Sequence, residues 1–124
     1  MTAGSTALDT PVYRAASTAR YVLVCDDPSQ IYEVEAATGA NAAYSFALAN
    51  VGLNADLTTV AASTTTGTSA AALDMSTALT TATLQFKILG VVQRPDNEPT
   101  GNFTKVLVKI NNATLGGGTG ATGQ

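Results

Sequence analysis

The sequence contains no histidine, no tryptophan and only one cysteine, Cys25. Without histidine, neither a histidine-dependent catalytic triad nor a zinc site of the common cysteine and histidine type can form. A single cysteine also excludes a disulfide bond within the chain. We therefore expect Cys25 to be a small, buried, apolar residue at the end of a strand.

Charge is also scarce, because charged residues make up 12% of the chain, which is about half the usual share. The net charge is −3, and the basic residues are scattered: Arg14, Arg20, Lys87, Arg94, Lys105 and Lys109. Nucleic-acid binding needs a clustered basic surface, and an anionic membrane attracts basic segments. We therefore expect neither a nucleic-acid nor a membrane partner, and no apolar run is long enough to span a membrane.

The most β-prone residues near the start are Tyr-Val-Leu-Val-Cys at 21–25. A turn of Asp, Asp, Pro and Ser follows at 26–29, and residues 30–36 alternate as a strand should. In that second segment Tyr32 and Val34 face one way, while the glutamates face the other. The pattern predicts a hairpin of two strands joined by the turn.

The last third predicts a second hairpin. Residues 82–94 form one expected strand, with Gly90 as a bend or bulge, and residues 102–111 form the other. Pro, Asp, Asn and Gly between them are typical of a connecting loop. We expect eight side chains to be mostly buried: Val22, Val24, Leu84, Phe86, Ile88, Val106, Val108 and Ile110.

The middle of the chain is less regular. Residues 42–48 fit either a short helix or a strand, residues 50–54 suggest a turn, and residues 56–62 fit a strand. Residues 63–81 are rich in Thr, Ala and Ser, and we interpret them as a long surface loop, with one helical turn near 70–73.

Together these patterns predict an all-β fold, a small antiparallel β-sandwich or barrel. We divide the chain into an extended N-terminal arm at residues 1–20, a β-domain at 21–111 that carries the long Thr/Ala-rich loop, and a flexible Gly/Thr-rich tail at 112–124. The arm and the loop lack the apolar periodicity that a core requires, so we expect both to become ordered on a partner surface.

Three patterns resemble chemical sites and are set aside. Residues 118–123 spell the GxGxxG of nucleotide sites, but only one residue follows where a helix should begin. Four residues could offer oxygen ligands to calcium, but their spacing matches no known calcium-binding loop: Asp96, Asn97, Glu98 and Asn102. Two acidic pairs could act in glycoside hydrolysis, but the sequence has no tryptophan to stack on a sugar: Asp26 with Asp27, and Glu33 with Glu35. We name no catalytic, cofactor-binding or metal-binding residue, and we expect no enzyme activity.

An ordered series of segments resembles a family of small structural proteins of tailed bacteriophages, usually described as head decoration or capsid cement proteins. The segments are RYVLVCDDPSQIYEVEA at 20–36, VGLNADL at 51–57, TGTSAAALDMST at 66–77, ATLQFKILGVVQRPDNEP at 82–99 and KVLVKINNATLGGGTG at 105–120. The resemblance covers most of the chain after residue 20 and rests on the order of the segments.

The resemblance implies a protein on the capsid exterior of the virion, which binds the major capsid protein and stabilises the head. The start of the chain lacks the pattern of a signal peptide, so we expect synthesis in the host cytoplasm. We also expect self-association, as a homotrimer in preference to a dimer, because closed symmetric assemblies are the default and shell sites offer threefold and twofold axes. The alternative is a receptor- or glycan-binding module of a phage fibre or tail, which exposed aromatic residues on loops would favour.

Overall fold

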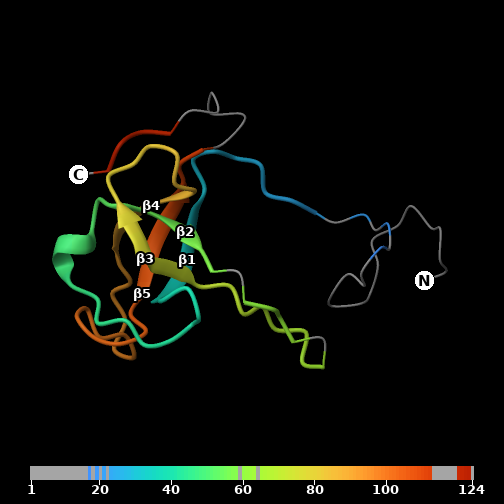
Figure 1. Ribbon diagram of the computed structural model, residues 1–124, viewed down its shortest axis with the longest axis horizontal. Coiled ribbons are helices and arrows are strands. Elements are labelled where there is room, and N and C mark those ends of the chain that lie inside the picture. Colours follow the sequence, from blue (N-terminus) through green and yellow to red (C-terminus); the bar gives the residue numbers. More distant parts are fainter. Residues whose placement is uncertain are drawn as a thin grey trace.

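The computed structural model describes residues 17, 19, 21, 23–58, 60–63, 65–112 and 120–123. Its strands are β1 (Ile31–Ala37), β2 (Asn54–Leu57), β3 (Leu73–Leu79), β4 (Phe86–Val91) and β5 (Lys105–Ile110), with a short 3₁₀ turn η1 at Leu48–Asn50. The strands form a closed barrel in the order β1-β3-β2-β4-β5 (Figure 1). The predicted all-β class is therefore confirmed, with a barrel as the architecture.

Strands β4 and β5 form the antiparallel pair expected from the sequence. Phe86 lies opposite Ile110, Ile88 lies opposite Val108, and the register shifts between Ile88 and Gly90. The predicted pairing and the predicted bulge at Gly90 are both confirmed. Each strand is shorter than its sequence pattern suggested, because the flanking residues form turns, bends and irregular connections.

Strand β1 closes the barrel, and its two edges are paired over different lengths. One edge pairs with β5 in antiparallel register over residues 31–35. The other edge pairs with β3 in parallel register at only two positions, Ala36 and Ala37. The remaining pairs, β2 with β3 and β2 with β4, are antiparallel. Antiparallel structure therefore dominates, as predicted, and one short parallel contact completes the ring.

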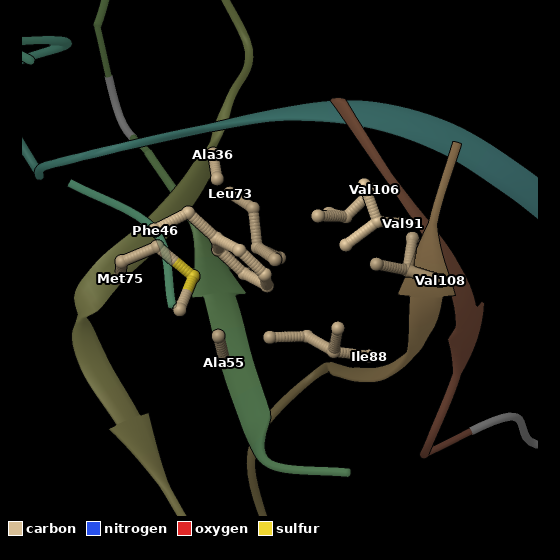
Figure 2. Close-up of a cluster of buried hydrophobic side chains, with 9 residues drawn as sticks. All are labelled: Ala36, Phe46, Ala55, Leu73, Met75, Ile88, Val91, Val106 and Val108. Carbon is tan, nitrogen blue, oxygen red and sulfur yellow. The ribbon is translucent and has the colours of Figure 1, made fainter. Parts of the chain in front are cut away.

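The barrel encloses an apolar core to which every strand contributes. Figure 2 shows its nine fully or nearly buried side chains pointing toward one another: Ala36, Phe46, Ala55, Leu73, Met75, Ile88, Val91, Val106 and Val108. Small alanines stand beside Phe46 and leave space for its ring, which is 1% exposed. This alternation of small and large residues is how the interior of a small barrel is filled.

The predicted core is correct for its central members. Ile88, Val106 and Val108 are buried, and three others are half-buried: Leu84, Phe86 and Ile110. Val24 is 75% exposed, so its predicted burial is wrong, and Val22 lies outside the described residues. The sequence prediction missed Phe46, Leu73 and Met75 because they lie in segments that it assigned to no definite strand.

The predicted hairpin of residues 21–25 with residues 30–36 does not form. Its second strand is confirmed as β1, and its turn is confirmed by the Ser29 and Gln30 amides, which donate to the Asp27 side chain and carbonyl at 2.8 and 3.2 Å. Tyr21 and residues 23–25 belong to no strand, and Cys25 is exposed rather than buried. A segment needs a partner edge as well as β propensity, and this one pairs with none of the described strands.

The predicted long loop at residues 63–81 is wrong in its second half, where β3 runs from Leu73 to Leu79. Leu73 and Met75 are buried and alternate with polar residues, and threonine is compatible with a strand because it is β-branched. The predicted helical turn near 70–73 is absent. The loop that remains, residues 58–72, is called the β2–β3 loop below.

The two other uncertain segments also take definite structures. In residues 42–48, Ala43 and Ser45 form isolated bridges to Ala37 and Asn102, so the segment is extended and becomes helical only at η1. The strand expected at 56–62 is β2, which lies slightly earlier, at 54–57. Residues 60–62 are exposed and irregular.

Asparagine side chains at the ends of strands form hydrogen bonds with the backbone of residues 120–123. Asn54 donates to the carbonyl of Ala121 at 2.8 Å, and Asn111 both donates to and accepts from the backbone of Ala121. The amide of Gly123 donates to the carbonyl of Thr80 at 2.9 Å. Residues 120–123, within the predicted tail, thus contact the barrel through hydrogen bonds, while residues 113–119 lie outside the described part.

Candidate interaction surface

Three of the acidic residues singled out from the sequence form structural contacts here: Asp27, Glu33 and Asp96. Glu33 forms a two-pronged pair with Arg94, whose Nη2 and Nη1 lie 2.6 and 3.1 Å from Oε1 and Oε2. The same guanidinium donates from Nε to Asp96 at 3.2 Å. Asp27 holds the turn that precedes β1. Arg94 thus brings Glu33 and Asp96 to one guanidinium, while Asp27 serves a separate turn.

The connection between β4 and β5 holds the residues considered as calcium ligands. Asn97 is buried there, and its Nδ2 donates to the carbonyls of Val92 and Lys105 at 2.8 and 2.9 Å. Its Oδ1 accepts from the Lys105 amide at 2.8 Å. Within the residues that the structure describes, no three His, Cys, Asp or Glu side chains are grouped to hold a metal ion.

The most exposed apolar residues lie just before β1. We call residues 23–30 the entry segment, because they lead the chain into the barrel. Leu23 is 85% exposed, Val24 is 75% exposed, and the preceding Tyr21 is 65% exposed. Ile31, the first residue of β1, is also exposed. Figure 1 shows the entry segment, in blue, running away from the barrel rather than across its surface.

Beside β1 the barrel wall is hollowed by an apolar groove of about 270 Å³. Its lining comes from every strand except β3, and from Ala71 of the β2–β3 loop: Tyr32, Glu33, Val34, Leu57, Ala71, Phe86, Val108 and Ile110. The groove exists because β1 meets β3 only at Ala36 and Ala37, so none of the described strands lies beside residues 31–35 on that edge. Apolar hollows of this kind at barrel openings are common binding sites.

One contact joins the entry segment to the rim of the groove. The hydrogen bond between the Tyr32 hydroxyl and the Cys25 side chain raises the pKa of Tyr32 above its ordinary value. Partial burial of the phenol, and then the negative charges of Cys25 and Asp27, raise the pKa of Tyr32 further. Cys25 thus lies at the edge of the groove, while Leu23 and Val24 remain in solvent.

The β2–β3 loop projects from the barrel as a second exposed feature (Figure 1). Its base continues the strand pair, since the Thr58 amide donates to the Ala72 carbonyl at 2.8 Å and the Ala72 amide donates to the Thr58 hydroxyl at 3.0 Å. Near its tip, Gly67 donates to the carbonyl of Ser63 at 3.0 Å with a positive φ of 68°. Of the predicted arm, residues 1–20, only Ser17 and Ala19 are described, and both are exposed.

The groove was not predicted as a site from the sequence. The alternation of residues 30–36 correctly placed Tyr32 and Val34 on one face. Leu57 and Ala71 gave no signal, because nothing in the sequence shows that β2 and β3 splay away from β1 at that point. A site formed by the ends of separate strands depends on register, and register is fixed by the whole barrel.

Comparison with protein-family models, with curated proteins and with solved structures found no match for this chain. Within the described residues, no helix is long and apolar enough to cross a membrane. The candidate interaction surface is therefore defined by geometry alone: the apolar entry segment and the neighbouring groove.

Proposed function

We propose that this protein is a bacteriophage capsid decoration protein, which binds the outer surface of the major capsid protein lattice and stabilises the head. The observation that carries the proposal is the run of exposed apolar residues at Tyr21, Leu23, Val24 and Ile31. Exposed apolar residues that cluster on one segment are typical of docking surfaces, whereas isolated ones are ordinary.

The rest of the surface is consistent with the proposal. Only 12% of the residues are charged, so an interface with a neighbouring subunit requires little desolvation of charge. The barrel offers a rigid body, and the entry segment and the β2–β3 loop project from it (Figure 1). A protein that binds the assembled shell and not free subunits stabilises the shell by mass action.

The direct test is co-sedimentation of the purified protein with capsids stripped of their decoration, combined with the temperature at which the shells release DNA. We expect the protein to sediment with the shells and to raise that temperature. The double substitution Leu23→Asp with Val24→Asp should weaken shell binding by at least about a hundredfold, because two apolar contacts are replaced by charges.

The matched control is Leu48→Asp, which places a charge at another exposed leucine, on η1, where exposure is 60%. This variant should bind shells as well as the unmodified protein. Deletion of residues 1–11 should leave the barrel folded and weaken binding. If the full chain neither binds shells nor raises their disruption temperature, the decoration proposal fails and a receptor- or glycan-binding module becomes the better explanation.

A further inference from the structure

Among the described residues, the exposed apolar run at Tyr21, Leu23 and Val24 and the groove are both uncovered, and both are apolar. Residues 21–25 consist of Tyr, Val, Leu, Val and Cys, a strongly β-prone run without a charge. Leu23 and Val24 are more exposed than any other large apolar residues of the described chain. An extended apolar segment of this kind gains most from an open sheet edge that lies beside an apolar hollow.

Strand β1 provides such an edge over residues 31–35. On that side β1 pairs with β3 only at Ala36 and Ala37, and the described strands leave the rest of the edge uncovered. Apolar side chains from several strands form the floor of the adjoining groove, including Val34, Phe86 and Val108. Uncovered edges of this length are usually protected in stable proteins, so a bound strand is the expected occupant.

We propose that residues 21–25 of one copy add as a strand to the open edge of β1 in a second copy, and that their apolar side chains fill the groove of that copy. The occupant is a second copy because the entry segment is directed away from its own barrel, beginning at the turn held by Asp27 (Figure 1). With its own barrel, the described part of the segment forms a hydrogen bond at the rim of the groove, between Cys25 and Tyr32. Each copy has one segment and one groove, so the exchange closes into a symmetric dimer or ring.

This exchange uses the same side chains that carry the proposed function, so it applies to the free protein before it docks on a shell, and it is tested without capsids. Ala71 lines the groove and is exposed, so Cys25→Ala combined with Ala71→Cys places a thiol there and removes the native one. This variant is mixed with the unmodified chain, which carries a size tag and keeps Cys25. Under mild oxidation, we expect a disulfide between the two different chains.

The matched control is Cys25→Ala combined with Ala47→Cys, which puts the thiol on an exposed alanine beside η1, outside the groove lining. The mixed disulfide should form at least about tenfold faster with the Ala71→Cys variant than with the Ala47→Cys variant, because docking raises the local concentration of the two thiols. Equal rates would overturn the proposal. So would a chain that keeps Cys25, carries Ala71→Cys and oxidises only within the monomer, because that result means the segment folds back on its own barrel.

A second measurement does not depend on thiols. Light scattering across a concentration series should show self-association of the unmodified protein. Leu23→Asp should weaken it by about ten- to a hundredfold, since one buried apolar contact is lost. The circular dichroism of the variant should still show a folded barrel, because Leu23 contributes nothing to the core. A protein that is monomeric at every concentration, or an unaffected Leu23→Asp oligomer, contradicts strand exchange.

Discussion

Residues 105–110, Lys-Val-Leu-Val-Lys-Ile, and residues 21–25, Tyr-Val-Leu-Val-Cys, have nearly the same local sequence. The first run is β5, in which Val106 is 0% and Val108 is 1% exposed. In the second run Val24, which corresponds to Val108, is 75% exposed, and Leu23, which corresponds to the half-buried Leu107, is 85% exposed. The two runs therefore share a propensity and differ completely in structure.

The difference lies in their neighbours. Strand β5 lies between β1 and β4, so both of its edges are paired and its inner side chains meet the rest of the core. Residues 23–25 pair with none of the described strands. Strand propensity describes how well a segment fits a sheet that is already present, and it does not provide the sheet.

The largest effect expected from this contrast is on folding stability. Phe46→Ala should lower the free energy of unfolding by about 3–5 kcal/mol, because it empties the centre of the core. In protein dilute enough to be monomeric, Leu23→Ala should change the same free energy by less than about 0.5 kcal/mol, since the side chain is then in solvent. Urea denaturation followed by circular dichroism measures both values. Similar losses for the two variants would show that residues 21–25 belong to the folded domain after all.

The sequence was sufficient to predict β4 and β5 because both strands have regular alternation and a connection with clear turn chemistry. The sequence was not sufficient at β3, where Leu73 and Met75 are the only large apolar residues on the inner face of a Thr- and Ala-rich run. Their burial depends on β1 and β2, which are distant in the sequence. The central position of Phe46 likewise follows from packing, because its own segment forms only isolated bridges.

A smaller loss of folding stability is expected when the buried side-chain amide of Asn97, in the β4–β5 connection, is removed. Asn97→Ala removes three hydrogen bonds to the backbone of Val92 and Lys105, and the groups left behind are poorly reached by water. The free energy of unfolding should fall by about 1–3 kcal/mol. Asn102→Ala, at an exposed site on the same connection, is the control and should be nearly neutral. Equal losses of stability for the two variants in urea denaturation would mean that the hydrogen bonds of Asn97 to Val92 and Lys105 are not the cause.

The surface ion pair between Arg94 and Glu33 should contribute still less to the free energy of unfolding. Its geometry is good, with two nitrogen–oxygen contacts, but the side chains are 43% and 37% exposed. Arg94→Ala should therefore cost no more than about 1 kcal/mol, and less at high salt, because solvent and ions screen the pair. Denaturation at low and high salt provides the measurement. A cost that does not change with salt would point to packing of the arginine stem instead.

The smallest and most local prediction concerns the hydrogen bond that connects the two regions. The bond to Cys25 holds the pKa of Tyr32 above its ordinary value of about 10. A raised pKa in the folded state favours the protonated phenol, so the stabilisation is complete below about pH 10 and is lost as the pH rises through the folded-state pKa.

Removal of the Cys25 side chain should therefore lower the pKa of one tyrosine, Tyr32. In an ultraviolet titration of phenolate absorbance under reducing conditions, Cys25→Ala should let Tyr32 ionise at lower pH than in the unmodified protein, because the largest cause of the raised pKa is gone. A Tyr32→Phe variant identifies which part of the titration curve belongs to this residue. Curves that superimpose with and without Cys25 would mean that the entry segment does not reach the rim of the groove, and that the barrel and the segment are independent even at their junction.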